Sequence, residues 1–149
     1  MKTIKPERVF NGTWSSVWVD DEEMAEATAC NAKATLEKTE VNQTGTLAKG
    51  FKVTGIEIKG SLKMNKVSSY FIKKMADNIK AGKTTVSQIR SKMADPDAAG
   101  AEDILLTGVT FDELTLIDWE ARKLLEEEIP FSATGFEVLE TVDHAAAMA

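Results

Sequence analysis

Cysteine and histidine are nearly absent from this chain, which has one of each, Cys30 and His144, among 149 residues. A single cysteine excludes an intrachain disulfide framework and a thiolate metal cluster, which indicates folding in a reducing cytoplasm. Because His144 lies in what reads as a frayed tail, no Ser-His-acid or Cys-His arrangement is expected on a rigid scaffold. We therefore expect no catalytic, metal or cofactor-binding residues, and we expect Cys30 to be a small core residue.

Long apolar runs are also missing. No uncharged segment is long enough to cross a bilayer, and the N-terminal "MKTIKPERVF" lacks the apolar stretch of a signal peptide. We expect neither export by a signal peptide nor membrane binding. With 43% hydrophobic residues, the chain can form one core. We expect a single domain over residues 1–149, with flexible ends at 1–9 and 141–149.

Charge of each sign is concentrated in one part of the chain. Residues 49–92 contain eleven Lys or Arg and two acids, a sum of +9, whereas residues 93–149 contain two bases and fourteen acids, a sum of −12. Basic and acidic strands could neighbour each other inside one subunit, or faces of opposite sign could let copies associate head to tail. An overall acidic chain is not typical of a nucleic-acid-binding protein.

Alternation of apolar and polar residues predicts strands in the first half. Residues 13–19 and 24–36 flank the polar turn "DDEE" and are predicted to form a β-hairpin. Trp14 and Trp18, spaced evenly on one strand, are expected to pack in the core. In the second arm the dry face would hold Cys30, Ala32, Ala34 and Leu36.

The stretch "EVNQTGTLAKGFKVTGIEIKGSLKM" changes parity in its middle. Apolar residues occupy even positions from Ile56 to Met64 but odd positions at Phe51 and Val53, with Gly55 between the two sets. Glycine tolerates the backbone angles of a bulge or bend that reverses which side faces in. We expect a protruding arm over about residues 38–55, of which residues 40–54 are mobile in the free chain.

The second half contains a helical pattern followed by strands. An apolar stripe at Val67, Phe71, Met75 and Ile79 predicts a helix over about 66–81, with Asn65 as N-cap and Gly82 after its end. Residues 84–93 and 103–119 read as strands around a turn. Residues 113–129 also fit a helical stripe, which the pattern alone slightly favours.

The acidic run Glu126, Glu127 and Glu128 has two interpretations. On a strand, only Glu126 and Glu128 share a face, so they could form a carboxylate pair or a cation site. No calcium-type loop surrounds them, and a solvated face is the better interpretation.

Four strings together resemble a known family. They are "EEMAEATACNAKATLEKTEVN", "KGFKVTG", "IKGSLKMNKVSSYFIKKMADNIKAGK" and "LEEEIPFSATGFEVLE". The chain resembles, from about Phe10 to about Leu139, the tail tube protein of contractile (myovirus-type) phage tails, prophage elements and R-type phage-tail-like bacteriocins. This resemblance implies a mainly β (α+β) fold, an antiparallel β-sandwich or barrel of two packed sheets with one flanking helix. It also implies strands at 113–118 and 123–131, with a break at 119–122.

The resemblance further implies a structural protein without enzymatic activity. Six copies would form a ring, and rings would stack into a hollow conduit inside a sheath. The implied partners are further copies of the chain, the sheath protein, baseplate or tail-tip proteins and a tape-measure protein, while DNA would pass through non-specifically in a phage. Assembly would occur in the bacterial cytoplasm, before the subunit becomes part of a virion tail or a released bacteriocin particle.

Two sets of residues are candidates for these roles. The first set, for contacts between subunits, is Val41, Leu47, Lys49, Phe51, Val53 and Gly55. The second set, for the lining of the tube lumen, is Lys33, Glu57, Lys59, Lys63, Glu126 and Glu128. The alternatives are a soluble β-sandwich binding module that uses the arm, and the related inner tube of a contractile secretion system. Whether the tube belongs to a phage or to a headless bacteriocin stays open.

Overall fold

The computed structural model describes residues 1–149, and its strands form a single antiparallel sheet of eight strands. The strand order is β2-β1-β5-β6-β7-β4-β3, and β8 pairs with β6. The strands are β1 (Ser15–Val19), β2 (Glu22–Glu23), β3 (Ala27–Val41), β4 (Gly50–Asn65), β5 (Val86–Met93), β6 (Glu102–Phe111), β7 (Glu126–Ala133) and β8 (Gly135–Glu140). The α-helices are α1 (Tyr70–Lys80) and the short α2 (His144–Ala147).

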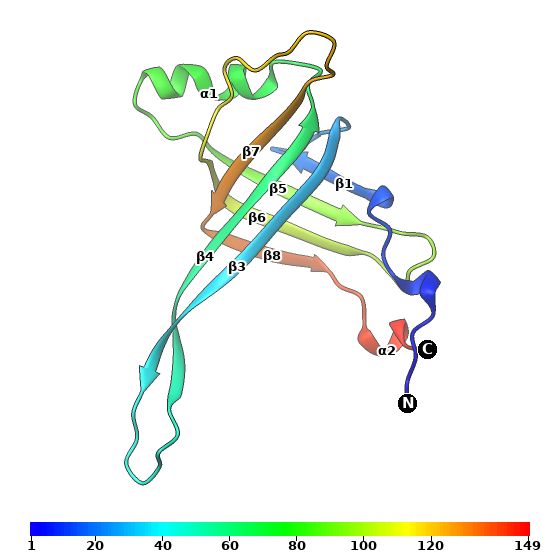
Figure 1. Ribbon diagram of the computed structural model, residues 1–149, viewed down its shortest axis with the longest axis vertical. Coiled ribbons are helices and arrows are strands. Elements are labelled where there is room, and N and C mark those ends of the chain that lie inside the picture. Colours follow the sequence, from blue (N-terminus) through cyan, green and yellow to red (C-terminus); the bar gives the residue numbers. More distant parts are fainter.

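The sheet folds over itself into two layers. β6 and β7 pair at only two positions, Thr110 with Ser132 and Phe111 with Phe131, so the sheet can turn a corner between them. Figure 1 shows β7, β4 and β3 crossing in front of the layer that contains β1, β5, β6 and β8. The predicted mainly β fold with one flanking helix is confirmed, and its two layers are parts of one continuous sheet.

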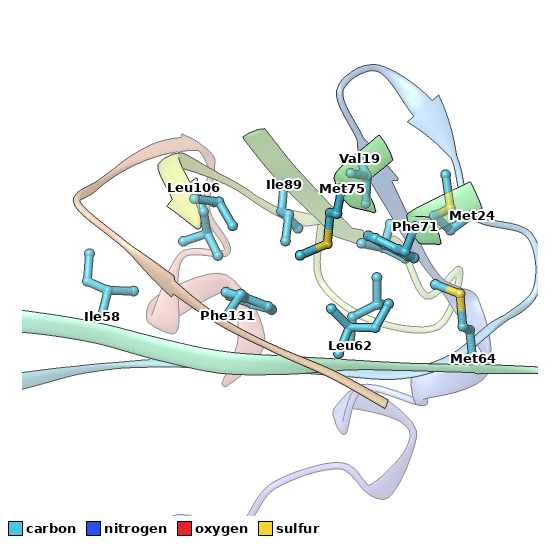
Figure 2. Packing of buried hydrophobic residues seen from close by; sticks show 13 residues of the cluster. Val19, Met24, Ile58, Leu62, Met64, Phe71, Met75, Ile89, Leu106 and Phe131 are labelled. Carbon is cyan, nitrogen blue, oxygen red and sulfur yellow. The ribbon is translucent and has the colours of Figure 1, made fainter. Parts of the chain in front are cut away.

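The core lies between these two layers and α1. Figure 2 shows Ile58, Leu62 and Phe131 from the β4–β7 layer pointing toward Ile89 and Leu106 of β5 and β6. Helix α1 contributes two buried side chains, Phe71 and Met75. The ring of Phe71 meets the ring of Phe111 edge to face, with centroids 5.2 Å apart. Helix α1 therefore covers one end of the core between the two layers.

Helix α1 begins later than its apolar stripe indicated. Its N-cap position is Ser69, so the prediction of Asn65 as N-cap is wrong. Asn65 is the last residue of β4 and pairs with Glu126, which keeps its backbone extended. Val67 and Ile79, expected on the buried stripe, are exposed. Gly82 follows the C-cap with φ +70°, as expected of a glycine that ends a helix.

The predicted hairpin of residues 13–19 with 24–36 is wrong. β1 turns back into the short β2 through Asp20 and Asp21, both with positive φ as in a type I′ turn. The chain then leaves β1, whose other edge pairs with β5, and β3 pairs with β4. The two-residue turn pairs β1 with the short β2, so β1 does not pair with β3. β4 is about as long as β3 and pairs with it along its length.

The tryptophans of the first strand do not form the core. Val17 and Val19 are the buried residues of β1, whereas Trp14 is 53% exposed. Trp18 points to the opposite face from the valines, where the guanidinium of Arg90 lies 5.0 Å from the centre of its ring. The prediction of core tryptophans is therefore wrong, because the valines between them face inward.

Residues 113–125 form no regular element. β7 begins at Glu126, so the strand expected at 123–131 is present from that residue, but the strand expected at 113–118 is not. The helix suggested by the apolar stripe is also absent. The β6–β7 ladder ends at Phe111 and Phe131, so residues 113–118 leave the sheet, although β7 has only β4 as a neighbour from Glu126 to Pro130. Leu114 still packs against the core, but Leu116, Ile117, Trp119 and Leu124 are exposed.

An ion pair joins the middle strands of the rear layer. Arg90 on β5 donates hydrogen bonds from Nε and Nη2 to the carboxylate of Asp103 on β6, at 3.0 and 2.6 Å. These hydrogen bonds, and the nearby charge of Lys92, hold the pKa of the Asp103 carboxyl below its usual value against the opposing effect of burial. The buried carboxylate therefore depends on Arg90 for its charge.

Replacing Arg90 with glutamine is expected to lower the melting temperature at neutral pH and to lower it much less near pH 3. Because the pKa of Asp103 is depressed in the folded state, its stabilising contribution is present above the unfolded pKa of about 3.9 and is lost as the pH falls. Thermal unfolding of both proteins across this range measures the difference. A deficit that stays constant with pH would show that Arg90 acts through packing on Trp18 instead.

Candidate functional site

The residues that sequence analysis considered for chemistry are not assembled into a site. His144 is exposed on α2, and no group of three or more His, Cys, Asp or Glu side chains is arranged to hold a metal ion. Neither helix is long and apolar enough to span a membrane. Glu126 and Glu128 do share a face of β7, but both are exposed, and Glu126 lies 3.7 Å from Lys63.

Cys30 is not enclosed in the core. It is exposed at the mouth of a cavity of about 190 Å³, opposite Ile89, Ile104 and Leu106 of the rear layer. Partial desolvation raises the pKa of its thiol. The prediction of a small core residue placed Cys30 on the correct face of β3, but the isolated chain leaves that part of the face uncovered.

β3 is an edge strand with almost no cover. It pairs only with β4, and every residue after Ala27 is exposed, including Leu36 and Val41. Its free edge presents unpaired backbone donors and acceptors over most of its 15 residues. Long exposed edges of this kind are templates for pairing with another chain, and monomeric proteins usually block them.

Two further strand edges are free. β4 pairs with β7 from Ile58 to Asn65, so its first half, residues 50–57, has β3 as its only neighbour. β8 pairs with β6 alone. Its apolar residues Phe136 and Val138 are each 51% exposed, although they lie beside Leu106 and Ile104 in the ladder. The two layers thus diverge toward the arm and leave an apolar face open between them (Figure 1).

The arm contains the bulge expected next to Gly55. Glu37 pairs with Gly55 but Lys38 pairs with Val53, so Thr54 is an extra residue on β4. Its hydroxyl lies 2.9 Å from that of Thr39. In register terms the extra residue brings Phe51 and Val53 onto the face that carries Ile56 and Ile58. The change of parity in the sequence therefore preserves one apolar face along the strand.

The candidate contact residues all lie in this arm. Leu47 is fully exposed, Phe51 is 64% exposed and Val53 is 45% exposed. Lys49 lies 3.5 Å from Glu40, an exposed pair across the base of the turn. None of the apolar side chains is covered by the chain's own fold, so their contact with other subunits stays a prediction.

The candidate lumen residues are brought together on one surface. Register aligns Lys33 with Lys59, and Lys63 with Glu128, across β3, β4 and β7. Lys59 is 3.1 Å from Glu57 on the same strand. All six candidates are exposed on the face opposite the core: Lys33, Glu57, Lys59, Lys63, Glu126 and Glu128.

This surface also shows how the two charged halves of the sequence meet. Basic β4 lies beside acidic β7: Lys63 is 3.7 Å from Glu126 on this surface, and Lys66, just after β4, is 3.5 Å from the inward-pointing Glu127. The interpretation that basic and acidic strands neighbour each other within one subunit is confirmed for this pair. Sequence analysis did not single out the loop at 113–125 or the exposed face of β8. The large apolar residues of the loop instead fitted a helical stripe that the structure does not contain.

Comparisons with known proteins agree with this architecture. The family model described as "Phage tail tube protein" matches residues 2–140. The phage-like element PBSX protein XkdM of Bacillus subtilis is 32% identical over 142 residues, covering 92% of this chain and 95% of that protein.

Two solved structures share the fold at low sequence identity. One is from the sheath-tube complex of the extracellular contractile injection system PVC, with a TM-score of 0.68, 12% identity and coverage of 91% and 95%. The other, from the sheath/tube terminator of the same system, has a TM-score of 0.68, 11% identity and coverage of 91% and 100%. The match of the family model along nearly the whole chain shows that this chain belongs to the phage tail tube protein family.

Proposed function

We propose that this chain is the subunit of the inner tube of a contractile tail, in which six copies form a ring and rings stack into a hollow conduit. The observation that carries this proposal is β3, a strand of 15 residues with a free edge and both faces exposed. A contact between this edge and a different free edge of the next copy can repeat around a ring. When the ring closes, neither of these two edges is left without a hydrogen-bonded neighbour. The whole chain would act as one tail tube domain.

The exposed face of β3, β4 and β7 is suited to line the lumen. Its six charged residues are three lysines and three glutamates, so this set carries no net charge. A polar lining keeps a channel filled with water, and a lining without net charge would let DNA pass without strong binding. The opposite face is apolar and must be covered.

The remaining roles follow from the same position in a particle. Relatives in fold come from a sheath-tube complex and from the baseplate of an anti-feeding prophage, so sheath and baseplate proteins are the proposed outer and terminal partners. A tape-measure protein would occupy the lumen during assembly in the bacterial cytoplasm. The subunit would have no enzymatic activity and no cofactor, and it would finally lie in a virion tail or a released particle.

Assembly followed by electron microscopy tests the proposal. The full chain, mixed with its baseplate proteins, is expected to form hollow tubes with six-fold rings. A chain that stays monomeric at high concentration, together with particles that assemble without it, would contradict the proposal. A binding module that uses the exposed Trp14 or the arm would also form no tubes.

Replacing Phe51 with serine is expected to reduce the yield of tubes at least about tenfold, since an exposed aromatic buried on assembly often dominates a contact. The free energy of unfolding of the monomer should change by less than about 0.5 kcal/mol, because Phe51 is 64% exposed. Chemical denaturation and quantitative electron microscopy measure the two effects. Ile79→Ser, on the exposed side of α1, is the control, and a collapse of monomer stability in the Phe51 variant would show that the arm packs within its own chain.

A further inference from the structure

A groove with acidic walls lies at the end of the molecule farthest from the arm. It has a volume of about 670 Å³ and lies between the loop at 113–125 and the start of β7. Two ammonium groups, those of Lys63 and Lys123, line it together with six carboxylates, a sum of −4. The carboxylates are those of Glu113, Asp118, Glu120, Glu126, Glu127 and Glu128.

The carboxylates of this groove are incompletely compensated within the chain. The side chain of Glu127 is 5% exposed, and its Oε2 lies 3.5 Å from Nζ of Lys66. Its other oxygen, Oε1, is buried and has no hydrogen-bond donor within reach. This unpaired oxygen is not open to a partner, but it adds to the negative potential beneath the groove.

The other ion pairs of the groove are long and exposed. Lys63 is 3.7 Å from Glu126, and Lys123 is 3.9 Å from Glu120. Pairs of this kind contribute little and exchange readily with competing cations. A cationic side chain from a partner can therefore enter without first breaking a strong internal pair.

The loop that forms one wall of the groove also carries exposed apolar side chains. Trp119, which lines it, is 72% exposed. Three neighbours in the same loop are also largely exposed: Leu116 at 69%, Ile117 at 83% and Leu124 at 93%. An exposed tryptophan in a loop that also carries exposed aliphatic residues is typical of a protein-binding surface.

The tip of the arm has the complementary chemistry. In "TLAKGFK", residues 46–52, the exposed Lys49 and Lys52 flank the exposed Phe51, and Leu47 is fully exposed. This segment contains no acid. Lys49 is 67% exposed at its side chain and pairs only with Glu40, at 3.5 Å.

The tip and the groove lie at opposite ends of the longest axis of the molecule. Figure 1 shows the turn between β3 and β4 at one extreme and the loop between β6 and β7, beside α1, at the other. A contact between such ends on two identical copies is heterologous and propagates along the axis instead of closing on itself. That is the geometry by which one ring can stack on the next.

We infer that the arm tip of one copy docks in the acidic groove of a second copy in the adjacent ring. Lys49 and Lys52 face the carboxylates, and Leu47 packs against Trp119. The inference rests on the proposed tube function, and it identifies the two surfaces that join one ring to the next.

Charge reversal tests the contact. The full chain carrying Lys49→Glu and Lys52→Glu, assembled with its baseplate proteins, is expected to form rings but tubes at least about tenfold shorter. Lys73→Glu with Lys80→Glu, exposed on α1, makes the same change of net charge and should leave tube length unaltered. Asp118→Lys with Glu120→Lys should be defective alone and should restore long tubes when combined with the arm variant.

A cross-link gives an independent readout. Leu47→Cys and Trp119→Cys, in a chain with Cys30→Ala, should form a disulfide between subunits of adjacent rings, seen as a ladder of covalent multimers under oxidising conditions. Wild-type tube length in the arm variant, no recovery in the combined variant, an equal defect in the α1 control or absence of the ladder would each overturn the inference. In every one of these outcomes wild-type tubes still form, whereas failure of the wild-type chain to form tubes counts against the proposed function itself.

Discussion

Replacing Phe131 with alanine is expected to lower the free energy of unfolding by about 3–5 kcal/mol. Phe131 has no exposed surface, and its ring fills the corner where β7 pairs with both β4 and β6. It lies between Ile58 and Leu62 of the front layer and Leu106 of the rear layer (Figure 2). Truncation removes the largest side chain at the junction of the layers and leaves a cavity that the sheet cannot close. The loss is a large share of the roughly 5–15 kcal/mol that stabilises a typical domain.

Phe51→Ala is the matched control for this result. The same atoms are removed from a strand of the same sheet, but Phe51 is 64% exposed, so the expected change is within about 0.5 kcal/mol. Equilibrium denaturation in urea, with both variants compared to the wild type, measures the two values. Equal effects at both positions would mean that Phe131 does not act through core packing.

Replacing Gly60 with alanine is expected to separate β3 from β4 and to destabilise the fold by about 3 kcal/mol or more, at the upper end of the cost of overpacking. A Cβ atom at Gly60 would overlap the carbonyl oxygen of Asn31 and would lie 2.8 Å from both Cα of Ala32 and Cζ of Phe131. Two of these three atoms belong to the backbone of β3 and cannot rotate away. Relief therefore requires the strand itself to move.

Gly12→Ala separates this steric effect from the general effect of replacing glycine. A Cβ atom there would meet nothing within 4 Å, so the expected change in stability is small. Thermal unfolding gives the stability of each variant, and hydrogen exchange of the β3 amides reports the pairing directly. Normal protection of β3 in the Gly60 variant would show that the sheet accommodates the methyl group without moving the strand.

Local sequence patterns correctly predicted the elements whose conformation does not depend on a particular neighbouring strand. The central turns of α1 follow from Phe71 and Met75, the only two buried residues of that helix. β5 and β6 follow from alternation around a turn-rich segment. Sequence patterns gave the wrong conformation where strand pairing with a distant segment determined the backbone. Asn65 is extended because β7 pairs with it, and residues 113–125 are irregular because the β6–β7 ladder does not continue past Phe111.

The candidate surfaces were predicted in the same uneven way. Alternation assigned Lys33 and Lys59 to wet faces, but only the register of β3 against β4 places them directly opposite each other. The acidic groove was missed because its carboxylates come from a loop and a strand, and because Glu127 points inward while Glu126 and Glu128 do not. A repeating sequence pattern cannot predict that side chains of a loop and of a strand come together.

By itself the sequence determined that this protein has a β fold with one main helix, an exposed arm, and strands with one charged, water-facing side. These properties depend on which residues prefer water and on the spacing between them, which is local information. Only the tertiary structure decided which strands pair, which edges remain free, and that the arm tip and the acidic groove lie at opposite ends. Those features depend on contacts between residues far apart in the chain, such as Phe111 with Phe131 at the corner of the sheet. Packing against distant partners overrides local preference there, because most of the stabilising free energy comes from burial between layers.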